Sequence, residues 1–413
     1  FGDTTAVRQS IYNNVRTAAQ AIEPVVNQTH TLQLVDVDYD DEDKDISLAD
    51  QKRAILEQRN LRRSLRGTWQ LLDNTTGKVL DKKRVTVAQV PYFSNRGTFI
   101  RNGNEYTLAH QMRLRSGIYH RRKDNGELEA DIRVKQGTGL QHRIYLDPKT
   151  GVFKAKVANA NIPLVSVLRA MGATDTEIRN AWGELSAVNM QKASPADLSK
   201  IYSKFVRGGV ETDARSRQEA VAKAFAKMEL NGMTTERTLG RSTNRVTVES
   251  LLASTRKLLA IQNKDDPKAL AKLGLEPADV DDRDSLAFMR FMGPEDLLAE
   301  RIGKNKALIN QALWKATAKQ SVQQIAPGMM TKSLDSVLFG SLAQPLEGIN
   351  PAQIFEQQSR VSKMGAGGIP DPRAVPVEAR NVQSSHLGFI DPIITPESER
   401  AGVDLRMARS SRK

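Results

Sequence analysis

The spacing of apolar residues changes within the chain, and this change constrains the fold more than any other feature. Between about residues 65 and 160, apolar residues alternate in short runs typical of strands, and the turn sequences Asn102-Gly103 and Asp147–Gly151 predict two hairpins. After Pro163 the spacing becomes that of an amphipathic helix, and Thr174-x-x-Glu177 predicts the start of another helix. This change from strand to helix spacing predicts an α+β fold.

Further elements are expected on both sides of this region. Residues 4–21 predict a polar helix, and residues 31–35 predict a short strand. Nearer the C-terminus, residues 294–302 and 304–319 predict two helices that lead into a loop-rich tail. The stretch from about 194 to 275 is rich in Ala, Lys, Arg and Glu with few aromatic residues, so we expect surface helices there.

Composition excludes several classes of protein. The 413 residues include no cysteine, which rules out disulfides, thiolate nucleophiles and metal sites with sulfur ligands. The five histidines form no HExxH motif and no close pair, which argues against a metal-dependent hydrolase. The absence of a long uncharged apolar run predicts no membrane span.

The net charge points to one kind of partner. A formal net charge of +13 favours a polyanion, because clustered Lys and Arg gain affinity by displacing counterions from phosphates. A solvated basic surface without a ligand explains the charge equally well.

An acidic run at residues 36–45 interrupts this basic composition. It could be a calcium loop, but Asp41 stands where such a loop needs its turn glycine and Ser47 where it needs the closing glutamate. We therefore expect a solvated acidic loop.

Two further patterns each have two interpretations. Gly365–Gly368 could let the backbone approach a phosphate closely, because glycine lacks Cβ and permits positive φ, or it could be a flexible turn. Aromatic residues between 92 and 119 lie among arginines, as in a surface on which single strands of nucleic acid stack. Their alternation within strands favours a role in the core. These aromatic residues are Tyr92, Phe93, Phe99, Tyr106 and Tyr119.

Several segments, read in order, carry more specific patterns. Val90–Glu105 contains the pattern P-x-x-x-x-x-G-T-F-I-x-N-G-x-E. Arg115–Tyr119 is similar to R-S-P-G-V without its proline, and Ile162–Gly172 is similar to I-P-x-x-x-L-L-R-A-L-G. Asp281–Asp284 is a short acidic segment, and Asn350–Glu397 runs from N-P through R-V-S-K-M-G-A-G-G to H-L-G-F-I-D-P-I-I-T-P-E. Together these segments resemble the N-terminal part of the β subunit of multisubunit DNA-directed RNA polymerase.

The resemblance implies a protrusion domain with an inserted lobe domain, followed by a loop-rich fork segment. The implied ranges are 1–120 for the first part of the protrusion, 121–280 for the lobe, 281–335 for the second part of the protrusion, and 336–413 for the fork and hybrid-channel wall. The chain stops soon after the T-P-E motif, and Ser398–Arg400 replaces the family's Gly-Pro-Asn. We therefore expect the split β subunit of a giant bacteriophage polymerase, in the host cytoplasm or packaged in the virion.

The implied function is that of an N-terminal β-type subunit of a DNA-dependent RNA polymerase, which forms one wall of the RNA:DNA hybrid channel and of the downstream DNA cleft. The implied partners are the DNA template, the RNA transcript, a C-terminal β-type subunit and β′-type subunits, with a sigma-like factor as an optional addition and no membrane. Mg²⁺ is expected on aspartates of the β′-type partner. No catalytic or metal-binding residue is expected in this chain, which alone should be inactive. The alternative is a non-catalytic nucleic-acid-binding virion or packaging protein.

The family's channel wall and fork imply a set of nucleic-acid-binding residues. Amide and guanidinium groups there can bond phosphates and riboses without reading bases, which suits an enzyme that accepts every sequence. Arg360 could instead tie its loop to neighbouring carboxylates. Gln357 stands where the family has histidine, and Arg400 where it has asparagine. The implied residues are Arg115, Gln344, Gln357, Arg360, Ser362, Arg373, Glu397 and Arg400.

Overall fold

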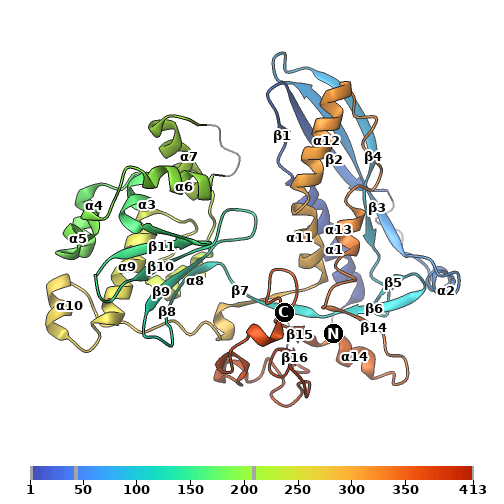
Figure 1. The fold of residues 1–413 in the computed structure, drawn as a ribbon. Helices are drawn as coiled ribbons and strands as arrows, with labels where there is room; N and C mark the ends of the chain where they lie inside the picture. The colour runs from blue at the N-terminus through green and yellow to red at the C-terminus, as the bar shows by residue number, and fades with distance from the viewer. Residues whose placement is uncertain (1–2, 41–44, 207–210, 412–413) are drawn as a thin grey trace. The chain divides into compact units, whose positions relative to one another are not determined.

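The chain folds into two compact units, each with helices and sheets (Figure 1). The computed structural model describes residues 3–40, 45–206 and 211–411. Unit 1 combines residues 1–113 with 289–413, and unit 2 consists of residues 114–288. One unit is therefore inserted into the other, and the α+β interpretation agrees with the mixed helices and sheets. The inserted unit spans residues 114–288, and the range 121–280 expected for a lobe stays a prediction.

Unit 1 contains a long antiparallel sheet with helices packed against it. The first helix begins at Thr4 and is capped by Asp3, whose carboxylate accepts a hydrogen bond from the backbone N–H of Thr5. The sheet has the order β1-β2-β3-β4, helix α11 packs on α1, and α12 packs on β1 and β2. These elements are α1 (Thr4–Gln20), β1 (Val25–Val26), β2 (His30–Tyr39), α2 (Leu48–Leu56), β3 (Arg62–Asp73), β4 (Val79–Pro91), α11 (Pro294–Gly303), α12 (Lys306–Lys319) and α13 (Thr331–Asp335).

Two small sheets bring distant segments of unit 1 together. One has the order β14-β6-β5 and the other the order β13-β7-β15-β16, in which β15 runs parallel to β7 and antiparallel to β16. Their strands are β5 (Phe99–Arg101), β6 (Asn104–Leu108), β7 (His110–Leu114), β13 (Met289–Met292), β14 (Ala343–Pro345), β15 (Arg360–Ser362) and β16 (Asp404–Arg406). The same part of the chain holds α14 (Gln353–Gln358) and three short 3₁₀ helices, Pro372–Ala374, Glu378–Arg380 and Ser384–His386.

Unit 2 is an antiparallel sheet of order β12-β11-β10-β9-β8 with helices packed on it. The strands are β8 (Gly117–Arg122), β9 (Leu128–Arg133), β10 (His142–Leu146), β11 (Phe153–Val157) and β12 (Ala160–Pro163). The helices are α3 (Leu164–Ala170), α4 (Asp175–Trp182), α5 (Leu185–Gln191), α6 (Asp197–Phe205), α7 (Ala214–Ala226), α8 (Gly232–Leu239), α9 (Val248–Gln262) and α10 (Pro267–Leu273), with a 3₁₀ helix at Leu286–Phe288.

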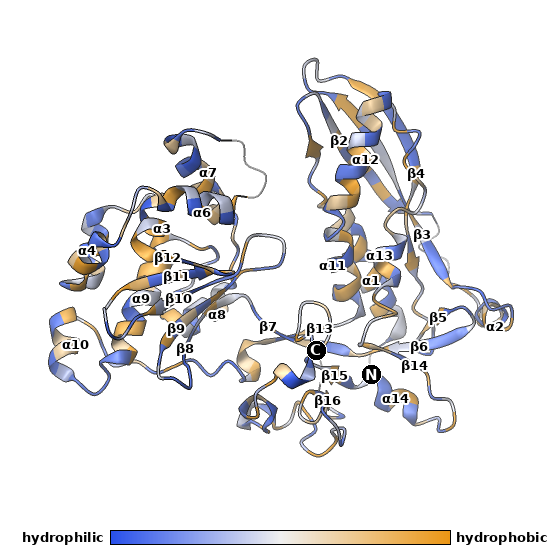
Figure 2. Ribbon diagram, in the orientation of Figure 1, coloured by the Kyte–Doolittle hydropathy of each residue, from blue (hydrophilic) through white to orange (hydrophobic). Residues whose placement is uncertain are grey.

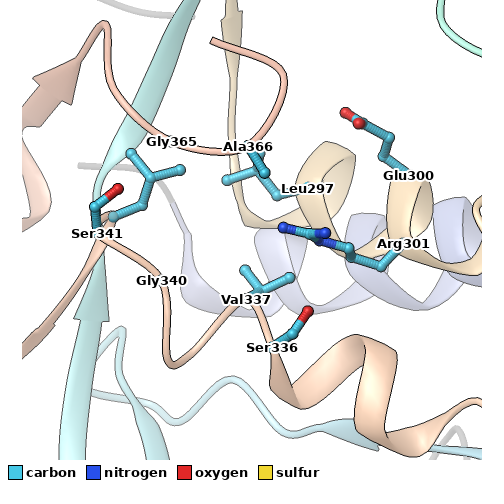
Figure 3. A pocket seen from close by; sticks show the side chains of 10 residues that line it. Leu297, Glu300, Arg301, Ser336, Val337, Gly340, Ser341, Gly365 and Ala366 are labelled. Carbon is cyan, nitrogen blue, oxygen red and sulfur yellow. The ribbon is translucent and has the colours of Figure 1, made fainter. Parts of the chain in front are cut away.

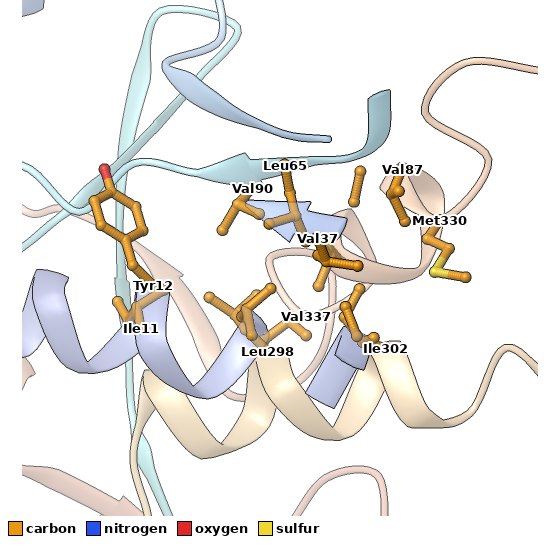
Figure 4. Close-up of a cluster of buried hydrophobic side chains, with 14 of the residues drawn as sticks. Ile11, Tyr12, Val37, Leu65, Val87, Val90, Leu298, Ile302, Met330 and Val337 are labelled. Carbon is orange, nitrogen blue, oxygen red and sulfur yellow. The ribbon is translucent and has the colours of Figure 1, made fainter. Parts of the chain in front are cut away.

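Each unit has its own hydrophobic core. Figure 2 shows apolar and polar residues interspersed along the elements of both units, as expected where an element has one buried face. In unit 1, side chains from α1, the long sheet and α11 meet (Figure 4), among them Ile11, Leu65 and Leu298. In unit 2, Ile201, Phe225 and Leu258 are buried together.

This second core corrects the expectation of surface helices between about 194 and 275. Helices α6, α7 and α9 each bury apolar residues, and α9 buries Leu251, Leu252, Leu258, Leu259 and Ile261. The core is largely aliphatic here, so the low aromatic content did not indicate exposure.

Local sequence signals were confirmed where they carried specific geometry. The Asn102-Gly103 turn has positive φ at both residues, 47° and 75°, as a two-residue hairpin requires. Thr174 and Glu177 form the predicted capping box at the start of α4. Of the aromatic residues, Tyr92, Phe93, Phe99 and Tyr119 are buried, which confirms the core interpretation for these four, and Tyr106 is half-buried.

The acidic run does not form a loop throughout. Residues 36–39 belong to β2, because Val37 and Tyr39 enter the core and draw Asp36 and Asp38 into the strand. Asp45 forms an ion pair with the buried Arg8. Residues 41–44 of the predicted loop lie outside the described residues.

None of the helices in the described ranges is both long enough and apolar enough to cross a bilayer.

Candidate nucleic-acid interface

Strand β15 holds two of the predicted residues, Arg360 and Ser362, in the interior of unit 1. The strand lies between β7 and β16, with Val361 opposite His110 on one side and Ser362 opposite Asp404 on the other. All three residues of β15 are buried, and the side chain of Arg360 is only 6% exposed. The strand pairing therefore turns both side chains toward protein groups.

Arg360 ties three segments together. Its guanidinium donates hydrogen bonds to Oε1 of Gln344 at 2.6 Å and to the backbone carbonyl of Ser341 at 3.1 Å, and it lies 3.5 Å from the carboxylate of Asp404. Burial lowers the pKa of Arg360, while the charge of Asp404 acts in the opposite direction. These contacts match the alternative in which Arg360 ties its loop to a carboxylate.

Asp404 is the centre of this polar network. The hydroxyl of Ser362 donates to its carboxylate and accepts the backbone N–H of Met364 at 3.1 Å. Arg400 donates to the same carboxylate at 3.4 Å. Two guanidinium groups and a hydroxyl therefore satisfy one buried carboxylate, the condition under which a buried charge is tolerated.

Gln357 extends the network through α14. Its side-chain amide donates to the backbone carbonyl of Pro345 and accepts the backbone N–H of Glu347, both at 3.4 Å. The side chain is buried, so it supports the loop before α14. The fold thus brings Gln344, Gln357, Arg360, Ser362 and Arg400 together.

The remaining predicted residues are more open or lie elsewhere. Arg373 has a side chain that is 75% exposed and pairs with Glu399 at 2.7 Å, a contact that raises the pKa of Arg373. Glu397 is also exposed. Arg115 lies in unit 2, where its backbone N–H donates to the carbonyl of Phe288 at 2.8 Å.

The glycine segment after β15 has a defined shape. Gly365 and Gly367 have φ of +101° and +86°, and a Cβ on Gly368 would lie 2.5 Å from the carbonyl oxygen of Lys363. The amide of Gln111 donates to the carbonyl of Met364 at 2.7 Å. The segment is therefore a turn held in one conformation.

Sequence reasoning missed three residues that shape this region: Gln111, Arg113 and Asp404. Gln111 and Arg113 lie on β7 and bond the glycine segment or its neighbours. Asp404 is the only acidic residue between positions 400 and 413. A single acidic residue among arginines could have indicated that it forms ion pairs with them.

The chemistry of the region is that of ion pairing and amide hydrogen bonding. No group of three or more His, Asp or Glu side chains arranged to hold a metal ion occurs in the described ranges. Exposed arginines beside a satisfied polar network can contact phosphates, and backbone phosphates are the main target of such side chains in nucleic-acid-binding proteins.

Comparisons with known proteins give matches to subunits of RNA polymerase. The family model for RNA polymerase Rpb2, domain 3, matches residues 344–412. The β subunit of DNA-directed RNA polymerase from Tropheryma whipplei (strain TW08/27) is 25% identical over 372 residues, which cover 83% of this chain and 32% of that protein. The β subunit from Cyanidioschyzon merolae (strain NIES-3377 / 10D) is 27% identical over 355 residues, 81% of this chain and 33% of that protein. The chain spans about a third of the length of these curated relatives, and along most of its own length it is similar to β subunits of multisubunit RNA polymerase.

Proposed function

We propose that the chain is the N-terminal β-type part of a DNA-dependent RNA polymerase and that it forms one wall of the hybrid channel and the downstream DNA cleft. One observation carries this proposal. The segment that matches Rpb2 domain 3, residues 344–412, contains the whole polar network around Asp404 except its contacts with Ser341, together with the exposed Arg373 and Glu397.

The predicted residues divide by exposure into two roles. The buried Gln357, Arg360 and Ser362 position the wall, because each of them makes side-chain hydrogen bonds within the protein. The exposed Arg373 and the half-exposed Arg400 are proposed to contact nucleic-acid phosphates. Such contacts carry no base information, as a polymerase that copies every sequence requires.

The finer assignments follow from the same proposal. Unit 2 corresponds to the lobe, and unit 1 to the protrusion and the fork; the insertion of one unit into the other supports this assignment. The partners would be a C-terminal β-type subunit, β′-type subunits and, as an optional addition, a sigma-like factor. Mg²⁺ would be held by the β′-type partner, and no residue of this chain is assigned to it. A split bacteriophage enzyme in the host cytoplasm or virion remains the proposed setting.

The salt dependence of DNA binding tests the proposed contact residues. In Arg373→Gln, the slope of log K against log salt concentration for the assembled complex should fall in magnitude by about 1, the loss of one phosphate contact. Arg237→Gln is the matched control, because Arg237 is an exposed arginine on α8 of unit 2. Equal slopes for wild type and Arg373→Gln would remove Arg373 from the interface.

A pull-down of the tagged chain separates this proposal from its alternative. Co-purification with a large subunit that carries the magnesium-binding aspartates supports the polymerase. Co-purification with capsid proteins alone would instead support a virion or packaging protein.

A further inference from the structure

A small cavity in unit 1 lies between α11, the turn at residues 336–342 and the glycine segment (Figure 3). Its volume is about 70 Å³, several times the roughly 10–15 Å³ that one ordered water needs. The apolar side chains of Leu297, Val337 and Leu342 line it and are buried. None of the residues predicted from the sequence to bind nucleic acid lines this cavity.

Arg301 supplies a positive charge to the cavity. Figure 3 shows its guanidinium pointing into the space between α11 and the turn. Within the described ranges we find no hydrogen bond or ion pair from this guanidinium. The neighbouring carboxylate does not serve it, because Glu300 pairs with Arg113 at 2.7 Å and also with Lys304. The carboxylate that lines the cavity is therefore already paired, whereas Arg301 has no ion-pair partner in the described ranges.

The opposite rim of the cavity is fixed in place. Arg113 donates to the backbone carbonyl of Ala366 at 2.9 Å while it pairs with Glu300, so it connects the glycine segment to α11. A Cβ on Gly365 would approach both Leu342 and Gln111 at 3.1 Å, in a backbone conformation that favours glycine. The segment therefore brings its backbone close to the cavity without a side chain in the way.

The rim also offers hydrogen-bond donors. The backbone N–H groups of Ser341 and Ala366 donate to no protein acceptor in the described part of the chain. A guanidinium together with free backbone N–H groups is a combination that suits the oxygens of a phosphate, which an arginine can bind through two parallel hydrogen bonds.

We propose that this cavity binds one phosphate group, held by Arg301 and the backbone of the Ser341 and Ala366 turns. The group comes either from a nucleic-acid backbone or from free phosphate or pyrophosphate. The inference stands on the cavity and goes beyond the proposed function, so each can fail without the other. Of the two interpretations of Gly365–Gly368, it takes the one in which glycine admits a phosphate.

Selective ¹⁵N-glycine labelling of the full chain tests the proposal, because Gly340 and Gly365 line the cavity while the other 25 of the 27 glycines serve as internal controls. Titration with inorganic phosphate, with pyrophosphate and with a short single-stranded DNA should shift the amide signals of Gly340 and Gly365 for at least one of these three. If none of them shifts these two signals in the wild-type chain, the proposal is wrong.

Variants assign the effect to Arg301. Arg301→Gln should weaken the binding that causes the shifts about tenfold or more, the loss of a charge-assisted hydrogen bond. Arg301→Lys, which keeps the charge, should weaken it less, and Arg237→Gln should leave it unchanged. Equal affinity in wild type and Arg301→Gln would overturn the proposal.

The same titrations identify the source of the phosphate. Saturation by DNA at lower concentration than by free phosphate or pyrophosphate indicates a backbone phosphate. The reverse order indicates a free anion. Both results support a phosphate site in this cavity, and each is independent of whether the chain assembles into a polymerase.

Discussion

Unit 2 and the C-terminal segment of residues 344–411 are stabilised in different ways. Unit 2 encloses a large apolar core in which Phe153 and Trp182 stack with ring centroids 4.9 Å apart. The apolar cluster within the C-terminal segment consists of Met364, Val375 and Val403. The segment also has strand pairing and polar contacts, and it leaves Arg373 and Arg400 accessible to solvent. A region of this kind can present side chains to a ligand, whereas unit 2 can serve as a rigid body.

Both regions nevertheless contain a buried carboxylate with cationic partners. In unit 2, Asp281 accepts hydrogen bonds from His120 at 2.8 Å and from Lys257 at 2.7 Å. Burial alone would raise the pKa of Asp281, but these two partners outweigh it and hold the pKa below its ordinary value. In the C-terminal segment, Asp404 pairs with Arg360 and with the more exposed Arg400. Both carboxylates are buried, but the partners of Asp281 are largely enclosed, whereas the side chain of Arg400 is 43% exposed.

The largest expected difference in stability is between variants of a buried and of an exposed tryptophan. Trp182→Ala should lower the free energy of unfolding of unit 2 by about 3–5 kcal/mol, because the ring is fully buried and its Nε1–H donates to Thr255 at 2.8 Å. Trp314→Ala on α12 is the matched control; its side chain is 75% exposed, so the change should stay within about 0.5 kcal/mol. Urea denaturation followed by circular dichroism measures both, and similar losses would contradict the assigned core.

The second prediction concerns the enclosed carboxylate. Asp281→Asn should destabilise unit 2 by about 3 kcal/mol, because Lys257, whose side chain is only 17% exposed, would lose its counter-charge. Asp279→Asn removes an exposed partner of Lys264 and should cost at most about 1 kcal/mol. If both variants unfold at the same urea concentration, the Asp281 cluster does not stabilise the fold.

The third prediction concerns Asp404, the buried carboxylate with an exposed partner. Asp404→Asn should cost about 1–3 kcal/mol and should act locally, because Arg360 keeps its bonds to Gln344 and Ser341 and Arg400 can turn to water. Hydrogen exchange should increase in peptides from residues 344–411 and stay unchanged in unit 2. Asp371→Asn, at an exposed 3₁₀-helix cap, is the control. Increased exchange throughout unit 2 would show that the two regions are not independent.

The last prediction concerns the pH dependence of stability. Burial lowers the pKa of His120 and of His142 below the ordinary histidine value of about 6.5. The unfolded chain therefore binds more protons than the folded chain below that pH, so the stabilising contribution is complete above about pH 6.5 and is lost as the pH falls. The slope is at most about 1.4 kcal/mol per pH unit for each histidine.

Denaturation at a series of pH values between about 7 and 5 checks this. His142→Phe should reduce the slope, because a phenyl ring can keep the edge-on contacts with Phe205 and Phe225 without taking up a proton. A free energy of unfolding that stays constant across this range in the wild-type chain would contradict the prediction.

Local signals in the sequence predicted part of this fold. Some elements depend only on neighbouring residues and could therefore be predicted from the sequence. These are the turns at glycines, the capping box of Thr174 and the helix that begins at Thr4. The pairing of Val361 with His110 could not, because it joins residues far apart in the chain and depends on how unit 1 closes. The strand character of Asp36 to Tyr39 was hidden for the same reason: burial of Val37 overrides the acidic composition.

The location of the candidate interface could be predicted from the sequence, but the burial and the partners of its residues could not. The resemblance to β subunits located the segment that the Rpb2 domain 3 model matches. It did not distinguish Arg360 and Ser362, which strand pairing buries, from Arg373, which remains exposed. Burial of a polar side chain depends on its partners, here Asp404 and Gln344, and these came from segments that sequence reasoning had not connected.

The most direct measurement of the central claim is template-dependent nucleotide incorporation by the complex that co-purifies with the tagged chain. The complex should extend RNA on a DNA template, activity should disappear when this chain is omitted from the reassembled enzyme, and the purified chain alone should extend no primer. Primer extension by the single chain, or full activity of the assembly without it, would show that the proposed role is wrong.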